Sequence, residues 1–194
     1  MDIFTSRSVN VPIPKIKMFK EHWMEIYTPL VNIMGLQVRM NLKVPCVDLR
    51  IEDDNNQLCL EKGIQFLNAI LDGFAPDQAV NLLKNGTCLV KFHISEIKRL
   101  SGDNVSRAIG RIIGREGKVK SAIEHTMGVC MLIKEDEIFM LGDEEGIKKA
   151  KESISRLVLG AHPGSILNKL KVIASKQRKG CFETVHLKNE ENLL

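Results

Sequence analysis

Apolar residues in the second half of the chain recur with the spacing of three helices and three strands. Three- and four-residue steps predict helices over residues 105–113, 119–123 and 147–158. Short apolar runs predict strands over residues 88–94, 129–133 and 138–141, and the last two flank a polar turn and predict a hairpin. The predicted order is therefore β-α-α-β-β-α, with a short loop between the first two helices.

The first half repeats this order over residues 9–72. Alternating apolar residues predict a strand over residues 9–13, and helical spacing follows over residues 23–34. Proline breaks a helix interior but suits a first helical turn, so Thr28 and Pro29 predict that two helices meet there. The other predicted elements are a hairpin over residues 36–42 and 47–51 and a helix over residues 60–71. The fold class is α+β, with two modules of one design.

Short connections suggest that the two modules pack as one rigid body. A short helix over residues 76–83 bridges them, and no Gly- or Ser-rich linker separates them. After Pro163 and Gly164, a last helix is predicted with Ile166, Leu170, Ile173 and Ala174 facing inward. The expected parts are a first module with its bridging helix at 1–85, a second module at 86–162, a basic C-terminal helix at 163–180 and a loosely held tail at 181–194.

The loop between the paired helices of the second module is Gly114-Arg-Glu-Gly117-Lys118, directly after two isoleucines. Two glycines let the loop backbone approach a sugar-phosphate chain closely, because neither glycine has a Cβ that would hold the nucleic acid away. Amides of the loop and of the next helix then point at phosphate oxygens, and the helix dipole adds to the attraction. In this order of elements, the loop predicts a KH module that clamps single-stranded nucleic acid. We expect the loop to be exposed, so that Asp at both glycines would abolish binding and preserve the fold.

Other glycine motifs fit this loop poorly. A Walker-type phosphate loop would need four residues between Gly110 and Gly117, a Ser or Thr at Val119 and a leading strand. A dinucleotide-binding fingerprint would need Gly-x-Gly. An ordinary glycine-containing corner between two helices stays open as the plain alternative.

Positive charge gathers in the second half. Residues 1–85 carry 9 basic and 10 acidic side chains, whereas residues 86–194 carry 19 and 14. One basic cluster surrounds the loop and comprises Arg107, Arg111, Arg115, Lys118 and Lys120, opposed only by Glu116, which partly offsets Arg115. A second comprises Lys169, Lys171, Lys176, Arg178 and Lys179. A solvated helix face stays open for the second cluster, but beside a clamp loop phosphate contact is favoured.

The composition indicates a globular, intracellular and soluble protein. Hydrophobic residues make up 44% of the chain, no apolar run approaches a membrane span, and the first residues lack the features of a secretion signal. The five cysteines, which form no Cys-x-x-Cys pair, are expected to be reduced packing thiols at Cys46, Cys59, Cys88, Cys130 and Cys181. We expect no metal, no cofactor and no membrane contact.

We also expect no catalysis. The acidic clusters at residues 52–54 and 135–137 lie in predicted polar turns, where nothing converges their carboxylates on one metal ion. The five histidines show no ligand spacing and no partnered nucleophile. In the first module, the absence of a glycine pair and the slightly negative charge predict contact with protein or with the second module. Burial in its core is expected to explain Trp23.

As a whole, residues 9–179 resemble the partner-of-Nob-one (Dim-two) family of small-ribosomal-subunit assembly factors. The most specific matching segments are residues 19–29, 35–43, 102–114, 159–164 and 172–175. The resemblance implies two KH-like modules, the first without a clamp, and no catalysis. It implies that the protein holds the single-stranded 3′ region of the small-subunit rRNA precursor and docks the Nob-one-type endonuclease that trims it. Other assembly factors and ribosomal proteins are implied partners, in the nucleolus and nucleus and then with the precursor into the cytoplasm.

Carried over by position, the RNA-clamp role falls on the loop, and the basic residues around it are expected to contact phosphate. The expected RNA-binding residues are Arg107, Arg111, Ile113, Gly114, Arg115, Glu116, Gly117, Lys118, Lys120, Lys169, Lys176 and Arg178. Two alternatives stay open, a KH regulator of messenger RNA and a protein-interaction scaffold with a vestigial clamp. The low aromatic content of 5% disfavours a sheet that stacks bases on rings but suits an aliphatic KH groove.

Overall fold

A computed structural model describes residues 5–41, 43–51 and 57–175. The chain divides into two compact units, the first ending at Val90 and the second beginning at Lys91, with Leu141–Glu144 grouped with the first. Two three-stranded sheets have the orders β1-β3-β2 and β4-β6-β5. The predicted α+β class and the order of elements in both modules are confirmed. The boundaries at 85, 162 and 180, and the packing of the modules into one body, stay predictions.

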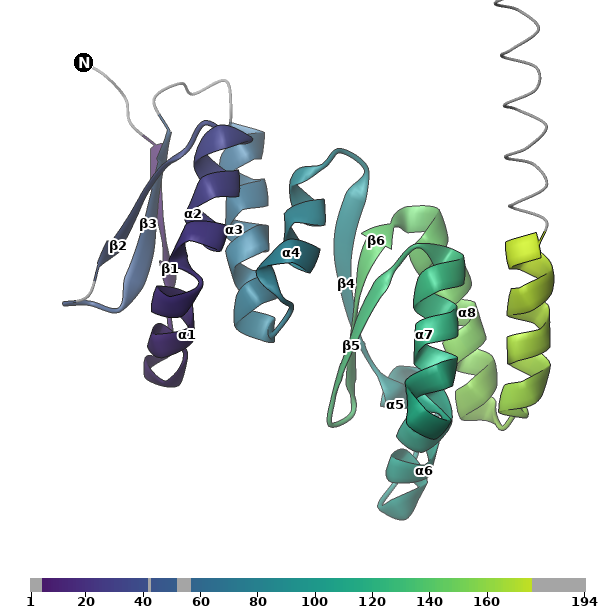
Figure 1. Cartoon of the computed structure of the whole chain (residues 1–194). Coiled ribbons are helices and arrows are strands. Elements are labelled where there is room, and N and C mark those ends of the chain that lie inside the picture. Colours follow the sequence, from purple (N-terminus) through teal and green to yellow (C-terminus); the bar gives the residue numbers. More distant parts are fainter. Residues whose placement is uncertain (1–4, 42, 52–56, 176–194) are drawn as a thin grey trace, which may run out of the picture. The chain divides into compact units, whose positions relative to one another are not determined.

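The first module runs from β1 to α3 (Figure 1). Its elements are β1 (Thr5–Asn10), η1 (Ile13–Lys15), α1 (Ile16–Glu21), α2 (Trp23–Asn32), β2 (Gln37–Asn41), β3 (Cys46–Ile51) and α3 (Gln57–Asp72). Both β1 and β2 pair antiparallel with β3. Two short turns of helix follow, α4 (Pro76–Ala79) and η3 (Val80–Leu83), where one bridging helix was predicted.

The core of the first module lies where α2 and α3 cover the sheet. Phe19, Leu49 and Phe66 are fully buried in it. A Cβ on Gly63 would lie 2.7 Å from Leu36 Cδ1 and 3.3 Å from Leu30 Cδ2, so α3 packs too closely here for any side chain. The predicted inner face of α3 is only partly correct. It buries Leu60, Gly63, Phe66, Leu67, Ala69 and Ile70, whereas Ile64 and Leu71 are half-buried.

Pro29 lies inside α2, so the predicted helix junction at Thr28 and Pro29 is wrong. The helices α1 and α2 instead meet at His22, whose φ of −100° and ψ of 18° are not helical. A proline in a helix interior costs about 3 kcal/mol. Because Ile26 and Leu30 of the same helix are fully buried, and each contributes about 1.5–3 kcal/mol, burial offsets that cost and α2 continues.

Two more details of this module differ from expectation. The strand predicted to reach Ile13 ends at Asn10, because prolines at 12 and 14 cannot donate to a sheet ladder, and Ile13 is 77% exposed. Trp23 is half-buried rather than part of the core. Its ring lies 5.9 Å from that of Tyr27, on the surface of the module.

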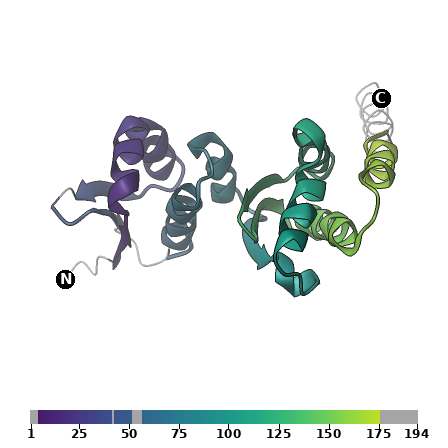
Figure 2. The ribbon, with the colours of Figure 1, turned by 90° about the horizontal axis from the view of Figure 1, so that it is seen from below.

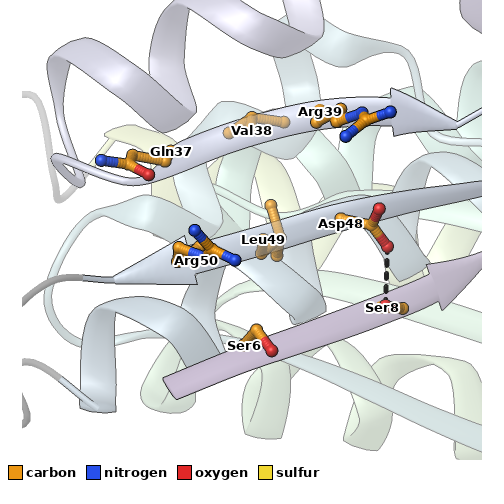
Figure 3. Close-up of a pocket in the computed structure, with 8 residues that line it drawn as sticks. All are labelled: Ser6, Ser8, Gln37, Val38, Arg39, Asp48, Leu49 and Arg50. Atoms are coloured by element: carbon orange, nitrogen blue, oxygen red, sulfur yellow. Dashed lines mark hydrogen bonds between the residues drawn. The ribbon is translucent and has the colours of Figure 1, made fainter. Parts of the chain in front are cut away.

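The outer face of the first sheet is polar (Figure 3). Alternation along β3 buries Leu49 and turns Asp48 and Arg50 to the other side. Two rows of polar residues therefore cross the three strands, Ser8–Asp48–Arg39 and Ser6–Arg50–Gln37. The Ser8 hydroxyl donates to Asp48 Oδ1 at 2.7 Å. This face suits solvent rather than a core.

The second module contains every predicted element and two additional helical turns, α5 and, within the loop, η4. Its elements are β4 (Thr87–His93), α5 (Ile94–Ile97), α6 (Asp103–Ile113), η4 (Arg115–Gly117), α7 (Lys118–Met127), β5 (Cys130–Lys134), β6 (Glu137–Asp143) and α8 (Glu144–Leu159). The predicted inner face of α8 is confirmed at all five positions, Ile147, Ala150, Ile154, Leu157 and Val158. Only two residues join β5 to β6, as the predicted hairpin requires.

A last helix covers residues 163–175. Figure 2 shows the turn that leads into it from α8, where the Ala161 amide donates to the Arg156 carbonyl at 2.9 Å. Ile166 and Leu170 are 3% and 2% exposed, so they anchor this helix as predicted. Ile173 and Ala174 are half-buried. The predicted continuation to residue 180 and the tail lie outside the described residues.

Candidate nucleic-acid interface

The Gly-x-x-Gly loop joins α6 to α7, and three of its residues have positive φ. Gly114 has φ 72° and ψ 176°, Glu116 has φ 54° and ψ 28°, and Gly117 has φ 73° and ψ 7°. The conformation of Gly114 is open essentially to glycine alone. That of Glu116 is uncommon for a residue with a Cβ. The sequence pattern thus specifies a sharply folded loop.

The two loop glycines have different roles. A Cβ on Gly114 would clash with Val119 Cγ2 and lie 2.8 Å from Val119 Cβ, so this glycine lets the loop pack on α7. A Cβ on Gly117 would meet nothing within 4 Å. The expectation that Asp at both positions would preserve the fold is therefore wrong for Gly114. Gly117 alone has the open approach that a phosphate needs.

Glu116 pairs with Lys118 rather than offsetting Arg115. Its Oε2 lies 2.8 Å from the Lys118 Nζ, and both side chains are largely exposed. Among the described residues, no ion pair includes Arg107, Arg111 or Arg115. Three guanidinium groups near the loop therefore lack an acidic partner there.

Four of the predicted cations line one hollow of about 500 Å³ beside the loop. Its lining consists of Arg107, Gly110, Arg111, Gly114, Arg115, Lys118, Val119, Pro163 and Leu167. No carboxylate is among these residues. Gly110, Pro163 and Leu167 were not among the expected RNA-binding residues, although the helix that carries Leu167 was predicted.

The other predicted residues lie elsewhere. Lys120 pairs with Glu124 at 3.8 Å, and Glu124 accepts the Met131 amide at 2.8 Å, so Lys120 faces β5 rather than the hollow. Ile113 is 37% exposed beside the loop. Lys169 is exposed on the last helix and does not line the hollow. Lys176 and Arg178 lie outside the described residues.

The first module has an apolar groove and no glycine loop. A hollow of about 480 Å³ is lined by Lys20, Trp23, Tyr27, Val38 and Met40. It lies between the paired helices and β2, an edge strand of the sheet. With one cation and two aromatic rings, this groove is chemically unlike the hollow of the second module.

The described residues form no group of three or more His, Cys, Asp or Glu side chains able to hold a metal ion. Of the predicted acidic turns, residues 52–54 lie outside the described residues, and Glu137 binds Lys91 at 2.8 Å.

Burial raises the pKa of the Cys88 thiol, and the carboxylates of Glu144 and Asp143 raise this pKa further. Among the described helices, none has the length and apolarity to cross a bilayer.

Comparison with known proteins finds similarity to PNO1 proteins. A model of the second KH domain of PNO1, a eukaryotic-type KH domain (type I), matches residues 91–175. The pre-rRNA-processing protein PNO1 of Kluyveromyces lactis is 38% identical over 90% of this chain and 65% of its own length. The RNA-binding protein pno1 of Drosophila pseudoobscura is 38% identical over 88% of this chain and 72% of its own. The chain thus spans about two thirds of the length of these curated relatives.

Solved structures share the fold. In a crystal structure of an a/eIF2alpha-aDim2p-rRNA complex from Pyrococcus horikoshii, a chain superposes with a TM-score of 0.68. That match covers 90% of this chain and 96% of the archaeal one, at 22% identity. It shows that the KH-like fold predicted for the modules is correct.

Proposed function

The chain belongs to the PNO1 family, and from that membership we propose that it is a non-catalytic, RNA-binding KH protein that acts in pre-rRNA processing. The observation that carries this proposal is the open approach at Gly117, flanked by three arginines without an acidic partner among the described residues. Similar proteins are named as RNA-binding or pre-rRNA-processing proteins. Both the names of these proteins and the chemistry of the loop support RNA binding.

The proposed contact is a phosphate of single-stranded RNA on the loop. The Lys118 amide donates to the Arg115 carbonyl. The amides that follow it in the first turn of α7 have no acceptor within the helix, and with the helix dipole they attract an anion. The RNA backbone lies against Gly117, where no Cβ intervenes, and Arg107, Arg111 and Arg115 neutralise neighbouring phosphates. Exposed Ile113 contributes an aliphatic surface for a base.

We propose that the bound RNA is the single-stranded 3′ region of the small-subunit rRNA precursor. The archaeal protein of similar fold was crystallised with rRNA. A KH groove holds about four nucleotides of single strand, which suits an unpaired precursor end and not a duplex. Binding there would be expected in the nucleolus and nucleus, and in the cytoplasm for as long as the precursor carries the protein.

The first module is proposed to contact protein, including the Nob-one-type endonuclease that trims this RNA, other assembly factors and ribosomal proteins. Residues 1–85 carry one more acidic than basic side chain, which disfavours phosphate. The Trp23 and Tyr27 rings are accessible in an apolar groove, and aromatic residues are enriched at protein interfaces. In this arrangement the second module holds the substrate while the first positions the enzyme.

Cross-linking the protein to RNA in its own cells, followed by mapping of the contacted nucleotides, tests the proposal. We expect contacts concentrated in the 3′ region of the small-subunit rRNA precursor, and a strong loss of them in the Gly117→Asp variant. Contacts dispersed over messenger RNAs would instead support the alternative that the protein is a KH regulator of messenger RNA. Contacts unaffected by Gly117→Asp would remove the loop from the binding site.

A further inference from the structure

The hollow beside the loop is closed on one side by the helix over residues 163–175, which lies outside the β-α-α-β-β-α unit. Pro163 and Leu167 contribute this part of the lining, and Gly110 and Arg111 of α6 contribute another part. The loop lines the same hollow through Gly114, so the hollow continues directly from the loop. Its volume of about 500 Å³ lies within the range of small-molecule sites, roughly 300–1,000 Å³.

We infer that this hollow holds the nucleotide next to those on the Gly-x-x-Gly loop, and that the last helix is thereby part of the RNA-binding surface. The inference rests on the proposed function and adds a second subsite to it. Four observations carry it, namely the charge of the hollow, a glycine that the fold does not need, the apolar wall and the continuity with the loop.

The positive charge of the hollow favours binding of an anion. Arg107, Arg111 and Arg115 surround it without an acidic partner among the described residues, and no lining residue is acidic. Arg111 also reaches the turn between α8 and the last helix, because its Nη1 would lie 3.8 Å from a Cβ on Gly160. A phosphate in the hollow would therefore meet guanidinium groups from α6 and from the loop.

Gly110 is in the interior of α6, where the fold gives no reason for a glycine. Glycine is unfavourable inside a helix compared with alanine. Yet a Cβ on Gly110 would meet no described atom within 4 Å, and its φ lies outside the left-handed range. The missing side chain leaves open space on the wall of the hollow. A ligand lying against the α6 backbone explains the missing side chain.

The wall from the last helix distinguishes a nucleotide from a free phosphate. Pro163 and the half-buried Leu167 add an apolar surface to a hollow that arginines also line. A base or ribose can pack on that surface while the phosphate meets the cationic rim. Buried Ile166 and Leu170 on the same helix hold the wall in place.

The test uses the whole chain and two fluorescein-labelled oligoribonucleotides of randomised sequence, a tetramer and an octamer. Anisotropy titration gives the ratio of the two dissociation constants. The wild-type protein is expected to bind the octamer about tenfold more tightly than the tetramer, because a base packed on a protein surface contributes about one order of magnitude. Gly110→Ala and Leu167→Glu should each reduce this ratio to about threefold or less, while Gly117→Asp weakens both oligomers and preserves the ratio.

Val172→Glu is the matched control, since Val172 is 56% exposed on the same helix and does not line the hollow. It should preserve the ratio. Gly110→Ala should raise the Tm through better helix propensity, so its loss of octamer affinity could not come from unfolding. If both hollow variants keep the wild-type ratio, the inference is wrong and the proposed function stands. If the wild-type protein binds neither oligomer, both fail together.

Discussion

The ammonium group of Lys118 lies 2.8 Å from Oε2 of Glu116, two residues earlier in the Gly-x-x-Gly loop. Lys118 is thus engaged by the loop itself, whereas Arg115, directly before Glu116, has no acidic partner among the described residues. A phosphate that approaches Gly117 must compete with the Glu116 carboxylate for this lysine. Glu116 is therefore expected to limit RNA affinity.

Replacing Glu116 with Gln should strengthen RNA binding severalfold. The freed Lys118 would neutralise one more phosphate, so the log-log salt dependence should steepen by up to roughly 0.7. Because the pair is exposed, the free energy of unfolding should change by less than about 1 kcal/mol. Filter binding over a series of salt concentrations measures both effects.

Glu145→Gln is the control for this experiment. It removes the same charge and an exposed ion pair of the same kind, 3.1 Å from Lys149 on α8. Equal gains in affinity from both variants would show that net charge, and not release of Lys118, is responsible. An unchanged salt slope in Glu116→Gln would exclude Lys118 from phosphate contact.

Gly117→Asp should lower RNA affinity at least about tenfold while leaving the protein folded. Asp tolerates the left-handed backbone better than most residues, and the position has free space. The lost affinity follows from a carboxylate placed where the phosphate approaches. Gly128→Asp makes the same change at the other end of α7, at φ 64° and also with nothing within 4 Å. If Gly128→Asp weakens binding equally, the loop has no special role.

Gly114→Ala should destabilise the protein by about 2–4 kcal/mol, because strain at φ 72° and ψ 176° combines with overpacking against Val119. Urea denaturation measures the loss. Since Val119→Ala removes the Cγ2 methyl that would clash, the double variant should lose less than the sum of the two single losses. Strictly additive losses would mean that the loop moves away from α7 without cost.

The elements that were predictable from the sequence are those with local causes. The five buried positions of α8 follow from helical period alone, and the Gly-x-x-Gly loop specifies its own sharp turn. The helix junction predicted at Pro29 was wrong because local propensity favours a break there, whereas burial of Ile26 and Leu30 stabilises a continuous helix. Tertiary burial in this case outweighs a local signal.

The candidate site was predictable only on the side formed by the loop and α6. Gly110 and Leu167 are far apart in the sequence, so no spacing rule could bring them to one hollow. The pairing of Lys118 with Glu116 depends on the left-handed backbone at Glu116, which is rare for a residue with a side chain. Charge counting alone therefore assigned Glu116 to Arg115 instead of Lys118.

Trp23→Ala should cost less stability than expected for a core tryptophan. Trp23 is half-buried beside Tyr27, so we expect a loss of about 1–2 kcal/mol rather than the 3–5 kcal/mol of a buried aromatic residue. Phe19 in the neighbouring helix is 0% exposed, and Phe19→Ala should show the full 3–5 kcal/mol. Urea denaturation of the two variants compares them directly. RNA affinity should not change in Trp23→Ala, because the groove that Trp23 lines belongs to the module without a clamp. If a stable Trp23→Ala variant had lost RNA affinity, the RNA contact would lie in the first module instead.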